Sequence, residues 1–200
     1  MEEDMKKIYK ICIIVSLLVL DAIYIYQAFA TQTYHRLATY LAVPFLVVLP
    51  WVYEKITKKP LNENLKLIYY TFIFIADGLG CVVDLYETTS WFDIFAHYLS
   101  GVLTAFLAIV LMKVFRYKET WLGILIYSLA VSCLVAVVWE IFEFGMDTIF
   151  GMNLQHVVET GIHDTMEDIL AAVIGAISFL ICYLATNKKG KLHKFIEDVI

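Results

Sequence analysis

Acidic side chains and one histidine fall into three sets in the C-terminal half of the chain, each at helical spacing. The sets are Asp93 and His97; Glu140, Glu143 and Asp147; and Asp164 and Asp168. Residues three, four or seven positions apart lie on one face of a helix, so each set can point in a single direction. Carboxylate oxygens together with imidazole suit magnesium, calcium, manganese, iron or zinc, and the sequence does not choose among them. We therefore expect a divalent metal ion to bind at these residues.

The segments that must position these side chains are long and apolar. The chain is 61% hydrophobic and 18% charged, whereas soluble domains are about 45–50% apolar and 25% charged. Apolar runs of about 20 residues match a hydrocarbon core of about 30 Å, and in lipid such runs must be helical. We predict an all-α polytopic bundle, a single transmembrane domain over 1–200 with a short cytoplasmic tail at 187–200. About six membrane helices are expected, near 8–30, 37–56, 65–86, 92–114, 121–149 and 166–186.

The basic residues alternate between the two sides of this topology. They lie near both termini and after the second and fourth predicted helices, and Arg36 alone falls on the other side. By the positive-inside rule both termini are cytoplasmic. Lys6, Lys7 and Lys10 precede an apolar stretch as in a signal peptide, but we interpret that stretch as the first membrane helix. The three acidic sets then lie at the outer ends of their helices.

In this arrangement the acidic sets form a small funnel that opens to the outer surface. At about 1.5 Å rise per residue, His97 and Asp168 lie about 6 Å deeper than Asp93 and Asp164, with Glu140 as the floor. Carboxylates buried together must be compensated by protonation or by a cation. The alternative is that these acids are ordinary solvated residues or first-turn acids of their helices, which fits Glu87, Asp93 and Asp164. This alternative fits four residues poorly because apolar sequence flanks them: His97, Glu140, Glu143 and Asp168.

Three weaker patterns accompany the funnel. Asp21 and Asp77 lie near the middle of the first and third predicted helices, where they have a structural role or relay protons. Four cysteines are isolated in apolar runs without metal-ligand spacing, and we interpret them as buried apolar residues. The third pattern is an equal spacing in two triplets of residues: Asp93, His97 and Gly101, and Asp164, Asp168 and Ala172. This match indicates either a parallel internal repeat or a coincidence.

Three ordered blocks carry a resemblance to known families: Trp91 to Gly101, Trp139 to Asp147 and His163 to Gly175. They look like the YjdF-like family of bacterial membrane-spanning proteins of unknown function and, more distantly, the VanZ-like family linked to teicoplanin resistance. The chain lacks the arginine that the VanZ-like pattern carries before the final helix, so no phosphate or carboxylate contact is carried over. The resemblance implies a multi-pass protein of a bacterial plasma (inner) membrane and supplies no activity.

Three functions fit these residues. The first is a metal-dependent enzyme acting on a lipid-linked or cell-envelope substrate. Glu143 or Asp168 would be its general base, and its ligands would be Asp93, His97, Glu140 and Asp164. The second is a cation or proton-coupled transporter, and the third is a non-catalytic membrane subunit. The expected partners are membrane lipids and a lipid-linked substrate. Nucleic-acid binding is not expected, because the basic residues are short cytoplasmic flanks, and the sequence does not define an oligomeric state.

Overall fold

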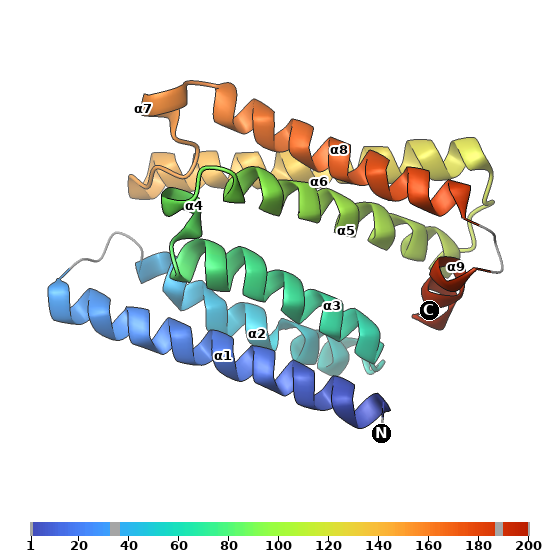
Figure 1. Ribbon diagram of the computed structural model, residues 1–200, viewed down its shortest axis with the longest axis horizontal. Helices are drawn as coiled ribbons and strands as arrows, with labels where there is room; N and C mark the ends of the chain where they lie inside the picture. Colours follow the sequence, from blue (N-terminus) through green and yellow to red (C-terminus); the bar gives the residue numbers. More distant parts are fainter. Residues whose placement is uncertain (1, 33–36, 187–189, 200) are drawn as a thin grey trace. The chain divides into compact units, whose positions relative to one another are not determined.

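A computed structural model describes residues 2–32, 37–186 and 190–199. Within these ranges the chain is helical and contains no strand. Six of the helices are long and apolar enough to cross a membrane (Figure 1), which confirms the predicted all-α fold and its membrane helices. The chain divides into two compact units, Met1–Phe92 and Asp93–Ile200. Arg36 lies outside the described residues, and the orientation and the single-domain organisation remain predictions.

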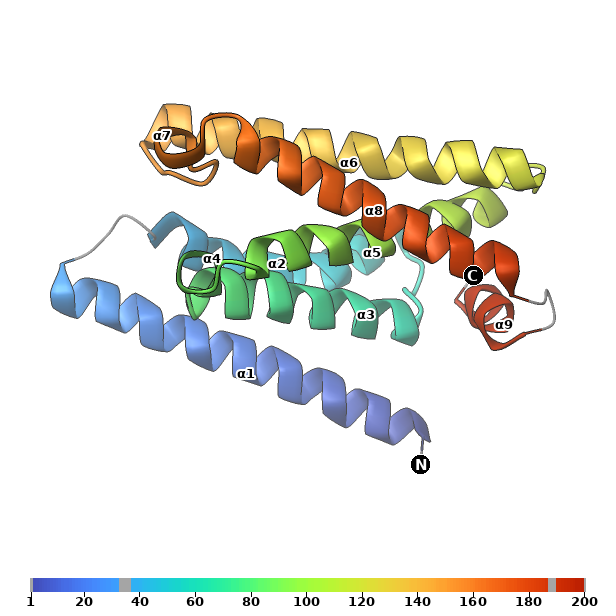
Figure 2. The ribbon, with the colours of Figure 1, turned by 45° about the horizontal axis from the view of Figure 1, so that its top comes forward.

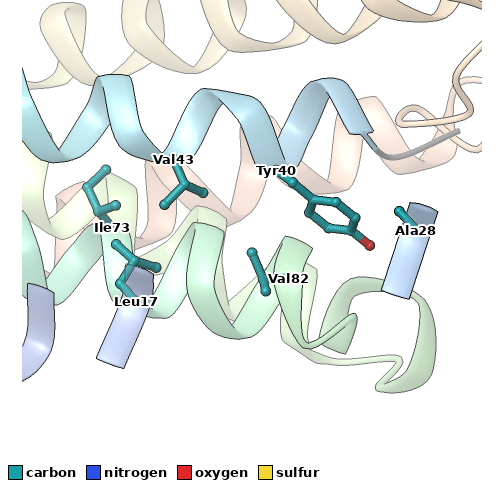
Figure 3. Packing of buried hydrophobic residues seen from close by; sticks show 6 residues of the cluster. All are labelled: Leu17, Ala28, Tyr40, Val43, Ile73 and Val82. Atoms are coloured by element: carbon teal, nitrogen blue, oxygen red, sulfur yellow. The ribbon is translucent and has the colours of Figure 1, made fainter. Parts of the chain in front are cut away.

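The first unit is built on α1 (Glu2–Thr31), α2 (Leu37–Thr57) and α3 (Glu63–Ile73). Helix α1 packs against both of the others. Figure 3 shows the apolar core between them, which consists of Leu17, Ala28, Tyr40, Val43, Ile73 and Val82. Pro50 has no N–H for the carbonyl of Leu46 four residues earlier, and the Tyr69 hydroxyl donates to that oxygen at 2.8 Å. The tyrosine thus pairs a carbonyl that the proline leaves free in the helix.

The third membrane segment changes its helical type part-way. Helix α3 continues as the π-helix η1 (Phe74–Val82), and the chain then turns at Asp84, with φ of 75°, into the short α4 (Leu85–Thr88). A Cβ at Gly78 would lie 2.8 Å from Leu17 of α1, so this glycine permits the close approach of the two helices. The region predicted as one helix at 65–86 is therefore interrupted, because apolar periodicity does not register a π-helical turn.

The second unit contains α5 (Phe92–Val114), α6 (Trp121–Phe150) and α8 (His163–Ala185), with the short α7 (Val157–Thr160) before α8. Figure 2 shows α6 and α8 side by side, and the two helices are in contact. Helices α5 and α6 are joined by a 3.0 Å hydrogen bond between the hydroxyls of Thr104 and Ser132. The three long helices therefore pack on one another within this unit.

Helices α5 and α8 approach each other at backbone distance. A Cβ at Gly101 would lie 1.8 Å from the carbonyl oxygen of Ala172, and a Cβ at Gly175 would lie 2.0 Å from that of Tyr98. Small residues permit such contact between membrane helices. The two helices run in the same direction (Figure 1), so the residues one turn before Gly101 and Ala172 also lie next to each other. Those residues are the candidate ligands of the sequence.

The C-terminal tail and the cysteines complete the description. Residues Lys191–Asp198 form the amphipathic helix α9, in which His193 is buried with its Nε2 3.1 Å from the carbonyl oxygen of Tyr183.

Cys12 and Cys182 are exposed on the surface of their helices. The expectation of buried cysteines is therefore wrong for these two, because in a membrane protein the outward surface is itself apolar and hydrophobicity does not distinguish it from the core.

Candidate metal site

His97 lies between two carboxylates near the N-terminal ends of α5 and α8, the ends that the sequence predicts to lie in the outer leaflet. Its Nε2 is 3.5 Å from Oδ1 of Asp93 and 3.7 Å from Oδ2 of Asp168. Asp93 is one helical turn away on the same helix, whereas Asp168 comes from α8. The close contact of α5 with α8 brings His97 and Asp168 together, and Asp168 is 2% exposed. These three residues are one group of potential ligands whose atoms all lie within 4.8 Å of one another.

Glu140 and Glu143 of α6 form a second group with Asp168. Their ligand atoms also lie within 4.8 Å of one another, and all three residues are buried. Glu140 is 5% exposed and Glu143 is 9% exposed. Asp168 therefore belongs to both groups, and the structure brings together five of the seven residues that the sequence proposed as ligands.

One oxygen of each glutamate is held by a neighbouring side chain. The indole Nε1 of Trp139 donates to Oε1 of Glu143 at 2.7 Å. The amide Nε2 of the buried Gln155 lies 3.3 Å from Oε2 of Glu140, 3.2 Å from the carbonyl oxygen of the same residue and 3.1 Å from Oγ1 of Thr165. The other oxygen of each glutamate, Oε1 of Glu140 and Oε2 of Glu143, is buried and has no hydrogen-bond partner among the described residues.

The remaining two proposed ligands lie outside these groups. The carboxylate of Asp147 accepts the backbone N–H of Leu154 at 2.7 Å and that of Gln155 at 3.0 Å. Asp147 thus shapes the loop after α6, and that loop carries the amide that holds Glu140. Asp164 is half-buried in the first turn of α8, one turn before Asp168. Neither residue is in the two groups, and their role as ligands remains a prediction.

Trp139 and Gln155 donate hydrogen bonds to the candidate ligands, and the sequence analysis did not identify either of them as part of the site. Trp139 precedes Glu143 by four positions and therefore lies on the same face of the helix. The spacing rule that grouped the acids could have identified this donor as well. Gln155 lies in an irregular segment between α6 and α7, and no periodicity relates it to Glu140. Its position follows only from the path of the loop, which Asp147 fixes.

The helices that carry the site contain one lysine, Lys113, and no arginine. It lies in the last turn of α5, sixteen residues after His97, a distance of about 24 Å along the helix at about 1.5 Å per residue. Among the described residues, no lysine or arginine forms an ion pair with Glu140, Glu143 or Asp168. Lysine and arginine side chains of the described chain therefore do not compensate these three acids.

The two acids that the sequence places near the middle of membrane helices of the first unit are not part of these groups. Asp21 of α1 is 3% exposed, and its Oδ1 has no hydrogen-bond partner among the residues described. Asp77 is half-buried in the π-helix η1. Single-turn π-bulges are frequent at functional sites, but neither residue joins a group of potential metal ligands in the described chain.

Comparison with known proteins places the chain in a family. The profile of the family described as "Predicted membrane protein (DUF2238)" matches residues 11–189. The chain belongs to this family. The chain is also 31% identical, over 127 residues, to an uncharacterized protein of Thermotoga maritima. That match covers 63% of the chain and 65% of the relative, so the chain spans less than two thirds of the length of this curated relative.

No solved structure matches the chain. Membership in DUF2238 is consistent with the YjdF-like resemblance, and the VanZ-like resemblance remains a prediction. The family description establishes a membrane protein and assigns no reaction, ligand or partner. Function must therefore be argued from the site.

Proposed function

We propose that this membrane protein binds a divalent cation and uses it to hydrolyse a lipid-linked or cell-envelope substrate. The cation would lie among Asp93, His97, Glu140, Glu143 and Asp168. The observation that carries this proposal is the pair of unpartnered carboxylate oxygens in α6. Oε1 of Glu140 and Oε2 of Glu143 are both buried without a partner among the described residues. An unmet buried acceptor costs about 1–3 kcal/mol, and more when it is charged, and a cation among these oxygens would remove that cost.

The donors around the site support the same proposal. Ligands of a metal are commonly oriented by hydrogen bonds from outside the coordination shell, which hold one atom and leave the other for the ion. Trp139 and Gln155 hold one oxygen of Glu143 and one oxygen of Glu140 in this way. Each glutamate is thus fixed in orientation with its second oxygen available.

The hydrolytic step follows from the chemistry of such a cation. A bound divalent ion polarises a phosphoryl or acyl oxygen and lowers the pKa of its bound water, which generates hydroxide near neutral pH. Glu143 or Asp168 would accept the proton from that water. The hydroxide would attack the phosphorus or the carbonyl carbon, and the same carboxyl group would return the proton to the oxygen that leaves as the ester bond breaks. Trp139, whose indole holds Glu143, is 47% exposed on an apolar helix surface. An apolar surface of a membrane helix next to the site would favour a substrate with a lipid anchor.

The test is a metal-binding measurement on the full-length protein purified in detergent. After removal of metal with a chelator, titration with Mn²⁺ or Zn²⁺ is expected to show saturable binding by calorimetry. Glu143→Gln is expected to weaken binding at least tenfold, whereas Glu167→Gln, an exposed neighbour of the site on α8, leaves it unchanged. Equal binding by both variants, or no saturable binding by the wild type, would contradict the proposal. Hydrolysis of a lipid-linked phosphate or ester by the metal-loaded protein tests the enzymatic step.

A second candidate function, cation or proton-coupled transport, is favoured by Asp21. A buried acid with an unpartnered oxygen inside a membrane helix is a functional candidate by default, and Asp21 lies in α1 rather than in the helices of the metal site. Proton-coupled flux into liposomes that Asp21→Asn abolishes would favour transport. Absence of flux together with metal-dependent hydrolysis would favour the enzyme.

A further inference from the structure

We infer that the site holds two divalent cations, with the carboxylate of Asp168 shared between them; this inference rests on the proposed cation site. The structure divides the five side chains into two groups of three, and Asp168 is the single residue common to both. One cation would lie among Asp93, His97 and Asp168, and the other among Glu140, Glu143 and Asp168. A carboxylate has two oxygens, so one residue can serve both ions.

The first group has the spacing of ligands around one ion. The two distances from Nε2 of His97 to carboxylate oxygens are 3.5 and 3.7 Å, which exceeds the about 2.7–3.2 Å of a hydrogen bond to nitrogen. Two ligand atoms bound tetrahedrally at about 2.1 Å from a metal are about 3.4 Å apart. The two observed separations lie close to this value, so Nε2 of His97 and the two carboxylate oxygens are spaced as ligands of one ion could be.

The second group has its own evidence for a ligand. Its three residues offer only oxygen, and the two unpartnered buried oxygens, Oε1 of Glu140 and Oε2 of Glu143, both belong to it. Neither glutamate is in the group that contains His97. An ion in the first group alone would be bound by Asp93, His97 and Asp168 and would leave the glutamate oxygens unmet.

Charge balance also favours two ions. Glu140, Glu143 and Asp168 carry three negative charges when ionised, and among the described residues no lysine or arginine forms an ion pair with them. One divalent cation compensates two of these charges and leaves one, which a second cation would compensate. Buried charge in a membrane segment is costly unless it is compensated, so the second ion completes the site.

The two positions differ in chemistry. Oxygen-only ligation suits hard cations such as Mg²⁺ or Mn²⁺, whereas the group with imidazole also accepts Zn²⁺ or Fe²⁺. Each group supplies three protein residues and leaves coordination positions for water and substrate. Paired ions about 3.5–4 Å apart stabilise both the attacking and the leaving oxygen of a displacement, which neither group alone would do.

The experiment is a stoichiometric Mn²⁺ titration of the metal-free full-length protein in detergent, read by elemental analysis and electron paramagnetic resonance. Two ions per chain with an exchange-coupled spectrum are the expected result. One ion per chain would overturn the two-ion inference and leave the proposed cation site intact. No bound ion would overturn both.

Variants identify which group holds which ion. His97→Ala and Glu143→Gln are each expected to retain one ion per chain with an uncoupled spectrum, and Asp168→Asn is expected to weaken both sites at least tenfold. Glu167→Gln is the matched control and retains two. Thermal unfolding confirms that each variant is folded, and the wild-type stoichiometry tests the inference even if one variant fails to fold. Loss of both ions in folded His97→Ala and folded Glu143→Gln alike would refute separate positions.

Discussion

The contact between α5 and α8 at Gly101 determines whether His97 can meet Asp168. A Cβ at Gly101 would lie 1.8 Å from the carbonyl oxygen of Ala172, whereas ordinary contact begins near 3.4 Å. Gly101→Ala must therefore separate the two helices by about 1.5 Å at this point. Because His97 and Asp168 lie one turn before Gly101 and Ala172 on parallel helices, their 3.7 Å separation grows by a similar amount.

Gly145→Ala is the matched control for this substitution. Gly145 also lies within a membrane helix of the second unit, two residues after Glu143, and a Cβ there would meet nothing within 4 Å. Both substitutions gain up to about 1 kcal/mol of helix propensity, so this contribution cancels between them. What remains for Gly101→Ala is the cost of overpacking, about 1–3 kcal/mol. We expect it to be less stable than Gly145→Ala by that amount.

The assay is reversible unfolding in mixed detergent, followed by Mn²⁺ titration of the folded variants. Gly101→Ala is expected to unfold at lower denaturant and to bind Mn²⁺ at least tenfold more weakly, whereas Gly145→Ala matches the wild type or exceeds it in stability. If Gly101→Ala equals Gly145→Ala in both measurements, α5 and α8 are not in backbone contact at Gly101 and the geometry of the site is wrong.

Three further predictions concern the surroundings of the site and the tail. Trp139→Phe removes the N–H that orients Glu143 and is expected to weaken Mn²⁺ binding about 10–100-fold, whereas Trp121→Phe, at the exposed start of α6, leaves the affinity unchanged; equal affinities would exclude an orienting role. Mn²⁺ at 100 times its Kd should raise the free energy of unfolding by about 2.7 kcal/mol. An equal free energy of unfolding with and without Mn²⁺ would show that the folded state does not bind it. His193→Phe keeps an aromatic ring against Tyr183 but removes the contact with its carbonyl oxygen, so amide exchange in α9 should rise about tenfold; unchanged exchange would mean that ring packing alone holds the helix.

The sequence by itself determined the class of fold and the faces of the helices. Apolar runs of about 20 residues leave helices as the structure that satisfies backbone groups in lipid, so six membrane helices follow from composition and length. Helical spacing then groups Asp93 with His97 and Glu140 with Glu143, since those pairs need only one helix. These local relations are visible in the sequence because the period of a helix does not depend on its neighbours.

Only the tertiary structure decided which of these faces meet. The contact of Gly101 with Ala172 brings Asp168 to His97, and the packing of α6 against α8 adds the two glutamates. Gln155 reaches Glu140 through a loop whose path Asp147 fixes, and no sequence period encodes that path. The division into two groups that share Asp168 is likewise a property of three helices packed together. Spacing along one helix determines which face carries a ligand. The packing of a second helix determines which residues lie opposite that face.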